Sequence, residues 1–202
     1  MKVSTSLLPR EFYDRPTLTV ARELLGAVLV RVEGGVRIAG RITETEAYVG
    51  ESDLACHARA GITPRTQIMY GDAGRAYVYF NYGMHWMLNA VTETEGFPAA
   101  VLIRAIQPIE GIEIIASRRG KQPRSKWTDG PAKLAQALAI DKSFNSVDLC
   151  SRESGLWIEA GERVLDESVT IGARVGLYTV PEPWKSMPWR FLVKIKEIAS
   201  SG

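Results

Sequence analysis

Two glutamates and a tyrosine occupy alternate positions in Arg41 to Gly50, a stretch rich in residues that favour β-strands. Alternate side chains of an extended strand share one face, so Glu44, Glu46 and Tyr48 are expected to point the same way. A carboxylate next to an aromatic ring is suited to act as a general base beside a flat ligand. A half-exposed edge strand with solvated glutamates would show the same pattern, and both interpretations stay open at this point.

The residues around this stretch predict a hairpin that would hold it in place. Ala27 to Val32 and Val36 to Val49 are rich in β-formers, and Gly34-Gly35 between them favours a tight turn. The second strand of this hairpin would carry Glu46. A helix is expected before it over Pro16 to Leu25, because apolar residues recur there at helical spacing.

A second hairpin is predicted further along the chain. Arg75 to Tyr82 is a candidate strand in which Tyr77 and Tyr79 share one face, and His85 to Val91 returns as its partner. An aromatic residue followed by glycine at the end of the first strand indicates a tight reversal. Such a reversal would project the ring of Tyr82 outward.

An apolar run from Ala99 to Ile106 predicts a further strand, and it contains a single charge, Arg104. An arginine inside such a run needs an anionic partner, because burial of an unpaired charge is costly. Glu46 is the first candidate for that partner. The alternative is that Arg104 marks the point where the strand leaves the core.

Helices are expected over Ile112 to Arg119 and Pro131 to Ile140, the second with Asp129 as its cap, and short strands over Leu156 to Val193. A chain of 202 residues with 46% hydrophobic residues is long enough for one sizeable core and short for two. We therefore expect residues 1–202 to form a single α+β domain. It would have a curved antiparallel β-sheet, surrounding helices and a protruding β-hairpin.

Several kinds of chemistry find no support in the sequence. Cys56 and Cys150 are far apart, and His57 and His85 do not stand at a metal-ligand spacing, so we expect no disulfide framework and no metal. Nucleotide-binding glycine patterns and the Gly-x-Ser-x-Gly elbow of serine hydrolases are absent from the sequence. We therefore expect no cofactor.

Charge and hydropathy bear on the partner of the protein. The net charge of +2 is small, but Arg118 to Lys126 forms a basic run. That run fits a loop that follows phosphates and equally fits a solvated connector. No run approaches the ~18 apolar residues of a membrane helix, and the first residues lack the features of a signal peptide. We expect a cytoplasmic protein that makes no membrane contact, associated with the nucleoid if bacterial.

Five blocks agree in order with a known family. They are Glu44-Thr45-Glu46-Ala47-Tyr48, Thr63-Pro64-Arg65-Thr66, Ala76-Tyr77-Val78-Tyr79, Tyr82-Gly83-Met84-His85 and Val101-Leu102-Ile103-Arg104-Ala105. With further likeness at 129–134, 136–138 and 173–176, the sequence resembles the alkyladenine (3-methyladenine) DNA glycosylases over most of its length. Five blocks in one order are far more specific than a single motif.

The resemblance implies a role for each matching residue. Glu46 would be the general base that activates water, and Arg104 would help to hold that glutamate and the water. The remaining implied roles belong to residues that contact DNA: Tyr48 and Tyr79 as the walls around an extruded base, His57 and Asn89 as further pocket residues, and Tyr82 as the wedge that enters the duplex. Met84, beside Tyr82, could flank that wedge or simply pack.

The resemblance further implies a monofunctional DNA glycosylase of base excision repair. It would flip alkylated or deaminated purines out of double-stranded DNA and hydrolyse the N-glycosidic bond. We expect it to act as a monomer. A non-catalytic nucleic-acid binding module that uses the Tyr82 hairpin and the basic run is the alternative from another class, and a glycosidase acting on free nucleosides or sugars is a second one.

Overall fold

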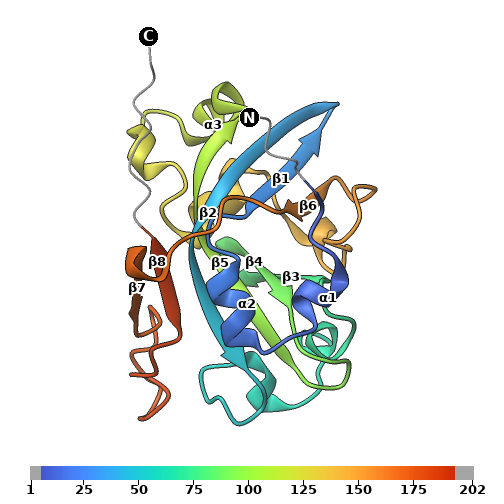
Figure 1. The fold of residues 1–202 in the computed structure, drawn as a ribbon, viewed down its shortest axis with the longest axis vertical. Coiled ribbons are helices and arrows are strands. Elements are labelled where there is room, and N and C mark those ends of the chain that lie inside the picture. The colour runs from blue at the N-terminus through green and yellow to red at the C-terminus, as the bar shows by residue number, and fades with distance from the viewer. Residues whose placement is uncertain (1–5, 194–202) are drawn as a thin grey trace.

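The computed structural model describes residues 6–193 and is built around one long strand, β2 (Val36–Val49). Strand β5 (Ala99–Glu110) pairs with one edge of β2 along most of its length. The other edge pairs first with β1 (Val28–Glu33) and then with β8 (Arg190–Val193). Two strands therefore share one edge of β2, which crosses the whole molecule (Figure 1).

The remaining strands extend this sheet on both sides. Strands β4 (His85–Val91) and β3 (Ala76–Asn81) follow β5, and β6 (Leu156–Glu159) follows β1. The order is β3-β4-β5-β2-β1-β6, with β8 linking β2 to β7 (Val169–Gly172). All pairings among these eight strands are antiparallel. The predicted α+β class with an antiparallel sheet is confirmed.

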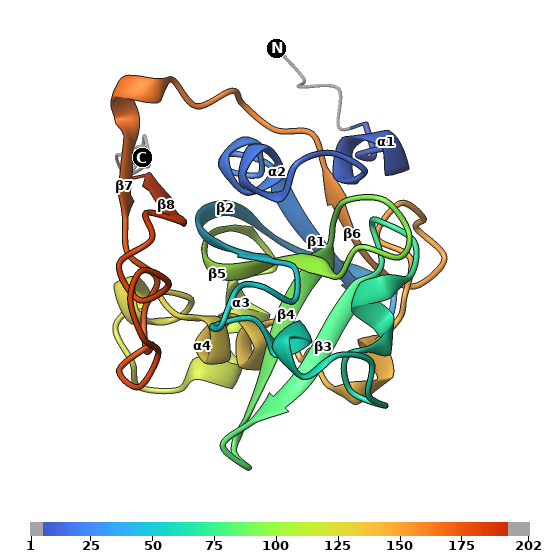
Figure 2. The same ribbon diagram turned by 90° about the horizontal axis from the view of Figure 1, so that it is seen from below.

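Helices cover the sheet on two sides. The short helices α1 (Arg10–Tyr13) and α2 (Thr17–Glu23) lie on the side opposite the tip of the β3–β4 hairpin, which protrudes from the molecule as predicted (Figure 2). Helices α3 (Ile112–Arg119) and α4 (Pro131–Ala137) pack against each other, and α4 also contacts β4 and β5. Five single-turn 3-10 helices complete the described part: His57–Ala60, Gln67–Tyr70, Arg124–Lys126, Lys142–Phe144 and Asp166–Ser168.

Both predicted hairpins are present, and their turns explain why. Gly34 and Gly35 join β1 to β2 with φ values of 55° and 79°, which side chains rarely tolerate and glycine adopts freely. Tyr82 and Gly83 join β3 to β4 with φ values of 50° and 65°. Tyr82 is not a glycine, so its left-handed backbone costs free energy, and such positions gather at functional sites.

One predicted helix cap is wrong. Asp129 was expected to cap α4, but the N-cap is Gly130, and no side chain caps the helix. The carboxylate of Asp129 instead accepts hydrogen bonds from Lys126 and Lys133. The ion pairs to two nearby lysines hold this carboxylate away from the first backbone N–H groups of the helix.

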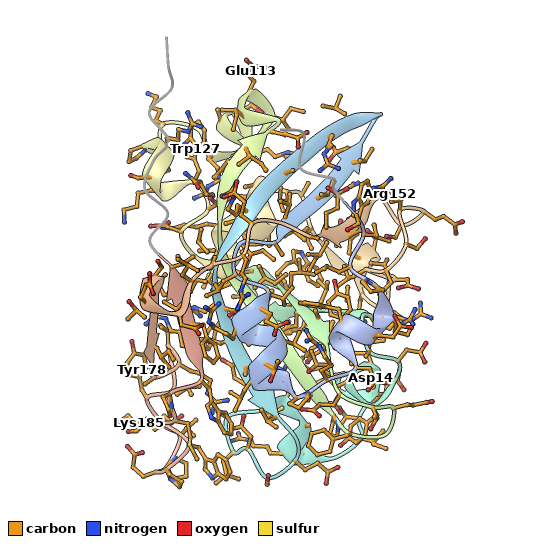
Figure 3. The ribbon with its side chains drawn as sticks, in the orientation of Figure 1. Asp14, Glu113, Trp127, Arg152, Tyr178 and Lys185 are labelled. Atoms are coloured by element: carbon orange, nitrogen blue, oxygen red, sulfur yellow. The ribbon has the colours of Figure 1, made fainter. Side chains whose placement is uncertain are left out.

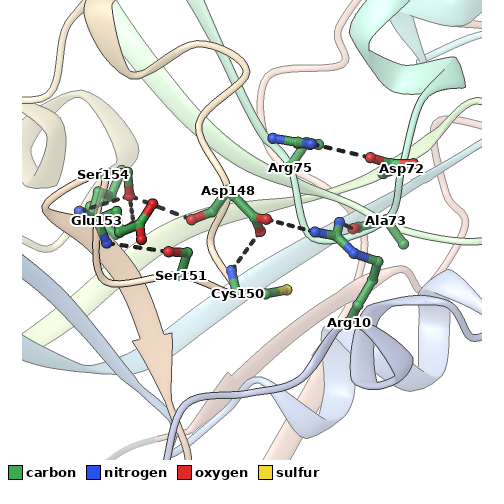
Figure 4. Close-up of polar contacts among 10 residues, drawn as sticks. Arg10, Asp72, Ala73, Arg75, Asp148, Cys150, Ser151, Glu153 and Ser154 are labelled. Atoms are coloured by element: carbon green, nitrogen blue, oxygen red, sulfur yellow. Dashed lines mark hydrogen bonds and ion pairs between the residues drawn. The ribbon is translucent and has the colours of Figure 1, made fainter.

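The N-terminal helix is tied to a distant loop by polar contacts (Figure 4). Arg10 donates to the carboxylate of Asp148, 2.6 Å away, and to the carbonyl of Ala73. Asp148 also accepts a hydrogen bond from the backbone N–H of Cys150 at 2.9 Å. These contacts join α1 to the turn before β3 and to the segment before β6, so one guanidinium connects three parts of the chain.

We expect Asp148→Ala to lower the free energy of unfolding by about 1–3 kcal/mol, because it leaves half-buried donors without their acceptor. Asp72 is the matched control, since it pairs with Arg75 through a side chain that is more exposed than that of Asp148, 49% against 27%. Asp72→Ala should cost about 0–1 kcal/mol. Chemical denaturation of the two variants measures both values, and equal losses would contradict this role of Asp148.

Candidate active site

The carboxylate of Glu46 is completely buried at the middle of the sheet. Its Oε2 atom accepts hydrogen bonds from the hydroxyl of Tyr48 at 2.9 Å and from Nη1 of Arg104 at 3.3 Å. Its Oε1 atom accepts a hydrogen bond from the backbone N–H of Val175 at 2.6 Å. The bond to Tyr48 shows that Glu46 and Tyr48 share one face of β2, as strand alternation predicts. The edge-strand interpretation with solvated glutamates is therefore wrong.

A β-bulge in β5 aims Arg104 at this carboxylate. In the pairing of β2 with β5, Glu44 lies opposite Ala105 and Thr45 lies opposite Ile103, so Arg104 is the extra residue between them. Bulges turn a side chain out of the regular alternation and are frequent beside active sites. The next two residues of β5, Ala105 and Ile106, are buried, so the alternative that Arg104 marks the point where the strand leaves the core is wrong.

A second carboxylate holds Arg104 from the other side. Oε1 of Glu44 accepts hydrogen bonds from Nε of Arg104 at 2.8 Å and from Nε of Arg190 at 2.6 Å. Arg190 lies on β8, directly opposite Glu46 in the register of the two strands. The guanidinium of Arg104 thus lies between two glutamates, and Arg190 balances the charge of one of them.

A cavity of about 210 Å³ lies in front of this network. It is lined by residues of β2, β3, β4 and β5, by the segment that contains His57, by Pro131 at the start of α4 and by residues 175–177. Its walls contain these predicted site residues: Tyr48, His57, Tyr79, Tyr82, Asn89 and Arg104. Glu46 is not among the lining residues. It lies directly behind three residues that are, because Tyr48, Arg104 and Val175 all bond to it.

Tyr77 connects two of the predicted pocket residues. Its hydroxyl lies 2.9 Å from Nδ1 of His57, and its carbonyl accepts a hydrogen bond from the amide of Asn89. The ring of His57 meets that of Tyr79 edge to face, with centroids 4.6 Å apart. Tyr77 is buried in the core and also lines the cavity. The alternation that places Tyr77 and Tyr79 on one face of β3 could have identified it.

The tip of the β3–β4 hairpin carries large apolar side chains into solvent. Tyr82 is 82% exposed and Met84 is 67% exposed. Tyr82 also contributes to the rim of the cavity. The structure therefore places the predicted wedge next to the predicted pocket, and it leaves Met84 exposed beside Tyr82 rather than packed in the core.

A segment without regular secondary structure forms the opposite side of the cavity. Residues 173–189 connect β7 to β8, and Val175, Gly176 and Leu177 reach the cavity. Figure 3 shows Tyr178 and Lys185 further along this segment, at one side of the molecule. The backbone N–H of Val175 is a donor that the sequence did not reveal, because no side-chain pattern identifies it.

Burial dominates the electrostatics of the site. It raises the pKa of the Glu46 carboxyl, and the Arg104 guanidinium, the Val175 N–H and the Tyr48 hydroxyl offset only part of this rise. Burial and the adjacent Glu46 carboxylate raise the pKa of Tyr48 well above its ordinary value, so its hydroxyl stays a donor. Burial also raises the pKa of the Cys56 thiol to about 12, which leaves this cavity residue un-ionised at neutral pH.

Other features bear on the possible ligands of the site. Within residues 6–193, no cluster of three or more His, Cys, Asp or Glu side chains is arranged to hold a metal ion. No helix of this part of the chain has the length and apolarity to cross a membrane.

The basic run from Arg118 to Lys126 is partly paired within the protein. Arg118 bonds to Glu33, Arg119 bonds to Gln136 and Lys126 bonds to Asp129, so three of its cations are engaged with the protein itself.

Comparison with known proteins points to one family. The model of the methylpurine-DNA glycosylase family matches residues 11–197. A protein of Myxococcus xanthus is 47% identical over 96% of this chain and 94% of its own length. Proteins of Methanocella arvoryzae and Anaeromyxobacter dehalogenans are 49% and 50% identical, each over 93% of this chain and over 92% and 83% of their own lengths. All three are named as 3-methyladenine DNA glycosylases.

We expect the imidazole of His57 to stay neutral at physiological pH. Burial and then the nearby Arg65 and Arg59 cations lower its pKa to about 4, because both disfavour the charged ring. The ring ¹⁵N chemical shifts of His57 should therefore stay constant from about pH 5.5 to 8, with a His57→Gln variant to assign the signals. A transition near the ordinary histidine pKa of about 6.5 would contradict this environment.

Proposed function

The chain belongs to the methylpurine-DNA glycosylase family, and from that premise we propose that it removes alkylated or deaminated purines from duplex DNA with a water molecule activated by Glu46. Membership makes it a DNA glycosylase that acts on DNA. We further propose that residues 1–202 act as one domain and as a monomer. The observation that carries the proposed mechanism is the fully buried Glu46 carboxylate directly behind a ring-lined cavity.

The hydrogen bonds of Glu46 leave one acceptor position for a water molecule. An ionised carboxylate has about four acceptor positions, and Tyr48, Arg104 and Val175 fill three of them. The remaining position is on Oε1, next to Val175. A water bound there would lie at the wall between the carboxylate and the cavity, and the raised pKa of Glu46 makes the carboxylate a better proton acceptor.

Base release would then proceed in one hydrolytic step. The C1′–N9 bond breaks and its electron pair leaves with the purine, while positive charge develops on the sugar. An alkylated, cationic purine departs neutral, and a neutral purine such as hypoxanthine takes up one proton from water as it leaves. The water oxygen bonds to C1′, and its proton passes to Glu46. The negative charge of Glu46 stabilises the developing positive charge, and Arg104 keeps the carboxylate in place. No lysine is found among the cavity-lining residues of the described chain, which supports hydrolysis without a covalent amine adduct.

The β3–β4 hairpin would help to expose the N-glycosidic bond. A glycosidic bond inside a duplex is out of reach, so the nucleotide must rotate out of the stack at a cost of a few kcal/mol. Tyr82, which is exposed and borders the cavity, would fill the space that the nucleotide leaves. The extruded purine would then stack between Tyr48 and Tyr79, with His57 and Asn89 against its edges.

Loss of the general base should slow base release strongly and leave binding to the damaged duplex intact. We expect Glu46→Gln to lower the rate of base release by about 10² to 10⁴-fold, because the amide cannot accept the proton of water. Release of free base from a duplex that contains one hypoxanthine measures the rate, and electrophoretic mobility measures binding. Glu162→Gln is the control, since Glu162 is exposed and pairs with Arg41 away from the cavity.

If the Glu46→Gln variant kept the native rate of base release, Glu46 would not be the general base. If the native protein bound the damaged duplex without releasing base, it would be a binding module. If it cleaved free nucleosides at the same rate as duplex, the glycosidase alternative would hold.

We expect Tyr82→Ala to weaken binding to damaged duplex more than binding to the same single strand. The reason is that only a duplex has a gap for the ring to fill, and stacking on a base contributes about 1–3 kcal/mol. Fluorescence anisotropy with labelled duplex and single strand measures both affinities. Equal loss on the two ligands would count against a wedge.

A further inference from the structure

The donor that Val175 offers to Glu46 comes from a segment with no regular secondary structure. Residues 173–189 form only turns and irregular backbone between β7 and β8. Nevertheless, the N–H of Val175 lies 2.6 Å from Oε1 of Glu46. Irregular surface segments are the more mobile parts of a fold, so this contact needs an anchor nearby. The neighbouring residue, Arg174, has the contacts of such an anchor.

Arg174 forms a buried ion pair with Asp53. Its Nη1 atom lies 2.5 Å from Oδ2 and its Nη2 atom 2.9 Å from Oδ1 of Asp53, and both side chains have no exposed surface. The same guanidinium donates to the carbonyls of Ala47, at 3.0 Å, and Trp184, at 3.1 Å. Four hydrogen bonds from one side chain therefore join the irregular segment to β2 at Ala47, the residue next to Glu46.

Asp53 is itself held in place by backbone N–H groups at the end of β2 and just beyond it. Oδ2 accepts a hydrogen bond from the N–H of Val49 at 3.2 Å, and Oδ1 accepts one from the N–H of Ala55 at 3.0 Å. Val49 is the last residue of the strand that carries Glu46, and Ala55 lies just before the segment that carries His57. Asp53 therefore links the end of β2 to Arg174 through hydrogen bonds.

Arg174 also contacts the aromatic partner of Glu46. Its guanidinium carbon lies 4.7 Å from the ring centroid of Tyr48 and 4.9 Å from that of Trp189, distances typical of cation–π contacts. Neither Arg174 nor Asp53 lines the cavity, whereas Tyr48 and Val175 do. The pair therefore touches two of the three groups that bond to Glu46 but cannot touch a ligand in the cavity.

We propose that the Arg174–Asp53 ion pair is the positioning unit of the active site, which holds the Val175 N–H and the Tyr48 ring at the distances that Glu46 requires. This inference rests on the proposed function, because it assigns the pair to the base of that reaction. The two residues act through Glu46 and are not catalytic themselves. Planar, bidentate pairing explains why arginine suits this position, since a lysine has no fork that could serve Asp53 and two carbonyls together.

The test uses variants that change the pair with little change in volume. Arg174→Lys keeps the charge and loses the fork, and Asp53→Asn keeps the shape and loses the charge. The maximal rate of base release from a hypoxanthine duplex is measured with enzyme in excess, from about pH 4 to pH 9. The enzyme concentration that gives half of that rate is obtained from the same data and reports binding.

We expect both variants to lower the maximal rate by about 100-fold, the effect of a displacement of about 1 Å at a reacting group. The half-maximal enzyme concentration should change less than about 3-fold. The acidic limb of the pH–rate profile should move to higher pH. The reason is that the Val175 N–H lowers the pKa of Glu46, and its loss means that the carboxylate becomes protonated at a higher pH than in the native protein.

Arg37→Lys is the matched control. Arg37 lies on β2 and, like Arg174, pairs through two hydrogen bonds with a buried carboxylate; its partner is Glu159, at the end of the strand far from the cavity. This variant should lower the melting temperature but keep the native maximal rate and the native pH profile. Its comparison with Arg174→Lys separates a general loss of stability from an effect on Glu46.

Every outcome decides the proposal. A folded Arg174→Lys or Asp53→Asn variant with the native pH profile would overturn it, as would failure of both variants to fold, because the pair would then serve folding alone. If the native protein released no base, the proposed function itself would fail. If the native protein were active and Glu46→Gln inactive while both pair variants matched Arg37→Lys, only the positioning inference would fail.

Discussion

The site depends on the contact between one buried carboxylate and its three donors. An ionised carboxylate loses its hydration in the interior, and only donors placed around it can compensate. For Glu46 one donor is a cation, Arg104, and two are neutral, so the compensation is incomplete and burial still raises its pKa. A carboxylate in this state is a stronger proton acceptor than one in water. Burial of the Glu46 carboxylate thus lowers the stability of the fold and at the same time suits the carboxylate to its proposed role as general base.

Strand patterns in the sequence predict much of this arrangement. Alternation along β2 predicts that Glu46 and Tyr48 share a face, and the two glycine turns predict both hairpins. Other features depend on tertiary structure and leave no local signal. The bulge that aims Arg104 arises from backbone geometry, and the backbone donor of Val175 comes from a residue far from Glu46 in sequence. Sequence periodicity therefore identifies the side chains of the site but not what holds them.

The aromatic walls bear on which purines the cavity would favour. Alkylation at N3 or N7 gives a purine positive charge, and electron-rich rings attract such cations by roughly 0.5–2 kcal/mol. Both walls already carry a guanidinium, Arg174 on Tyr48 and Arg65 on Tyr79, each 4.7 Å from the ring centroid. These cations draw on the same ring electrons, which weakens the added attraction for a charged lesion. Stacking and shape then contribute more of the selectivity, and both are available to neutral lesions such as hypoxanthine.

The most direct test of the central claim is a crystal structure of Glu46→Gln bound to duplex DNA with a single hypoxanthine. The account predicts that the hypoxanthine lies outside the helix between Tyr48 and Tyr79, with Tyr82 in the gap. It further predicts that C1′ of its sugar lies within one water molecule of the residue 46 side chain, on the side of Val175. A hypoxanthine that stays stacked in the duplex, or a C1′ atom turned away from residue 46, would contradict the account.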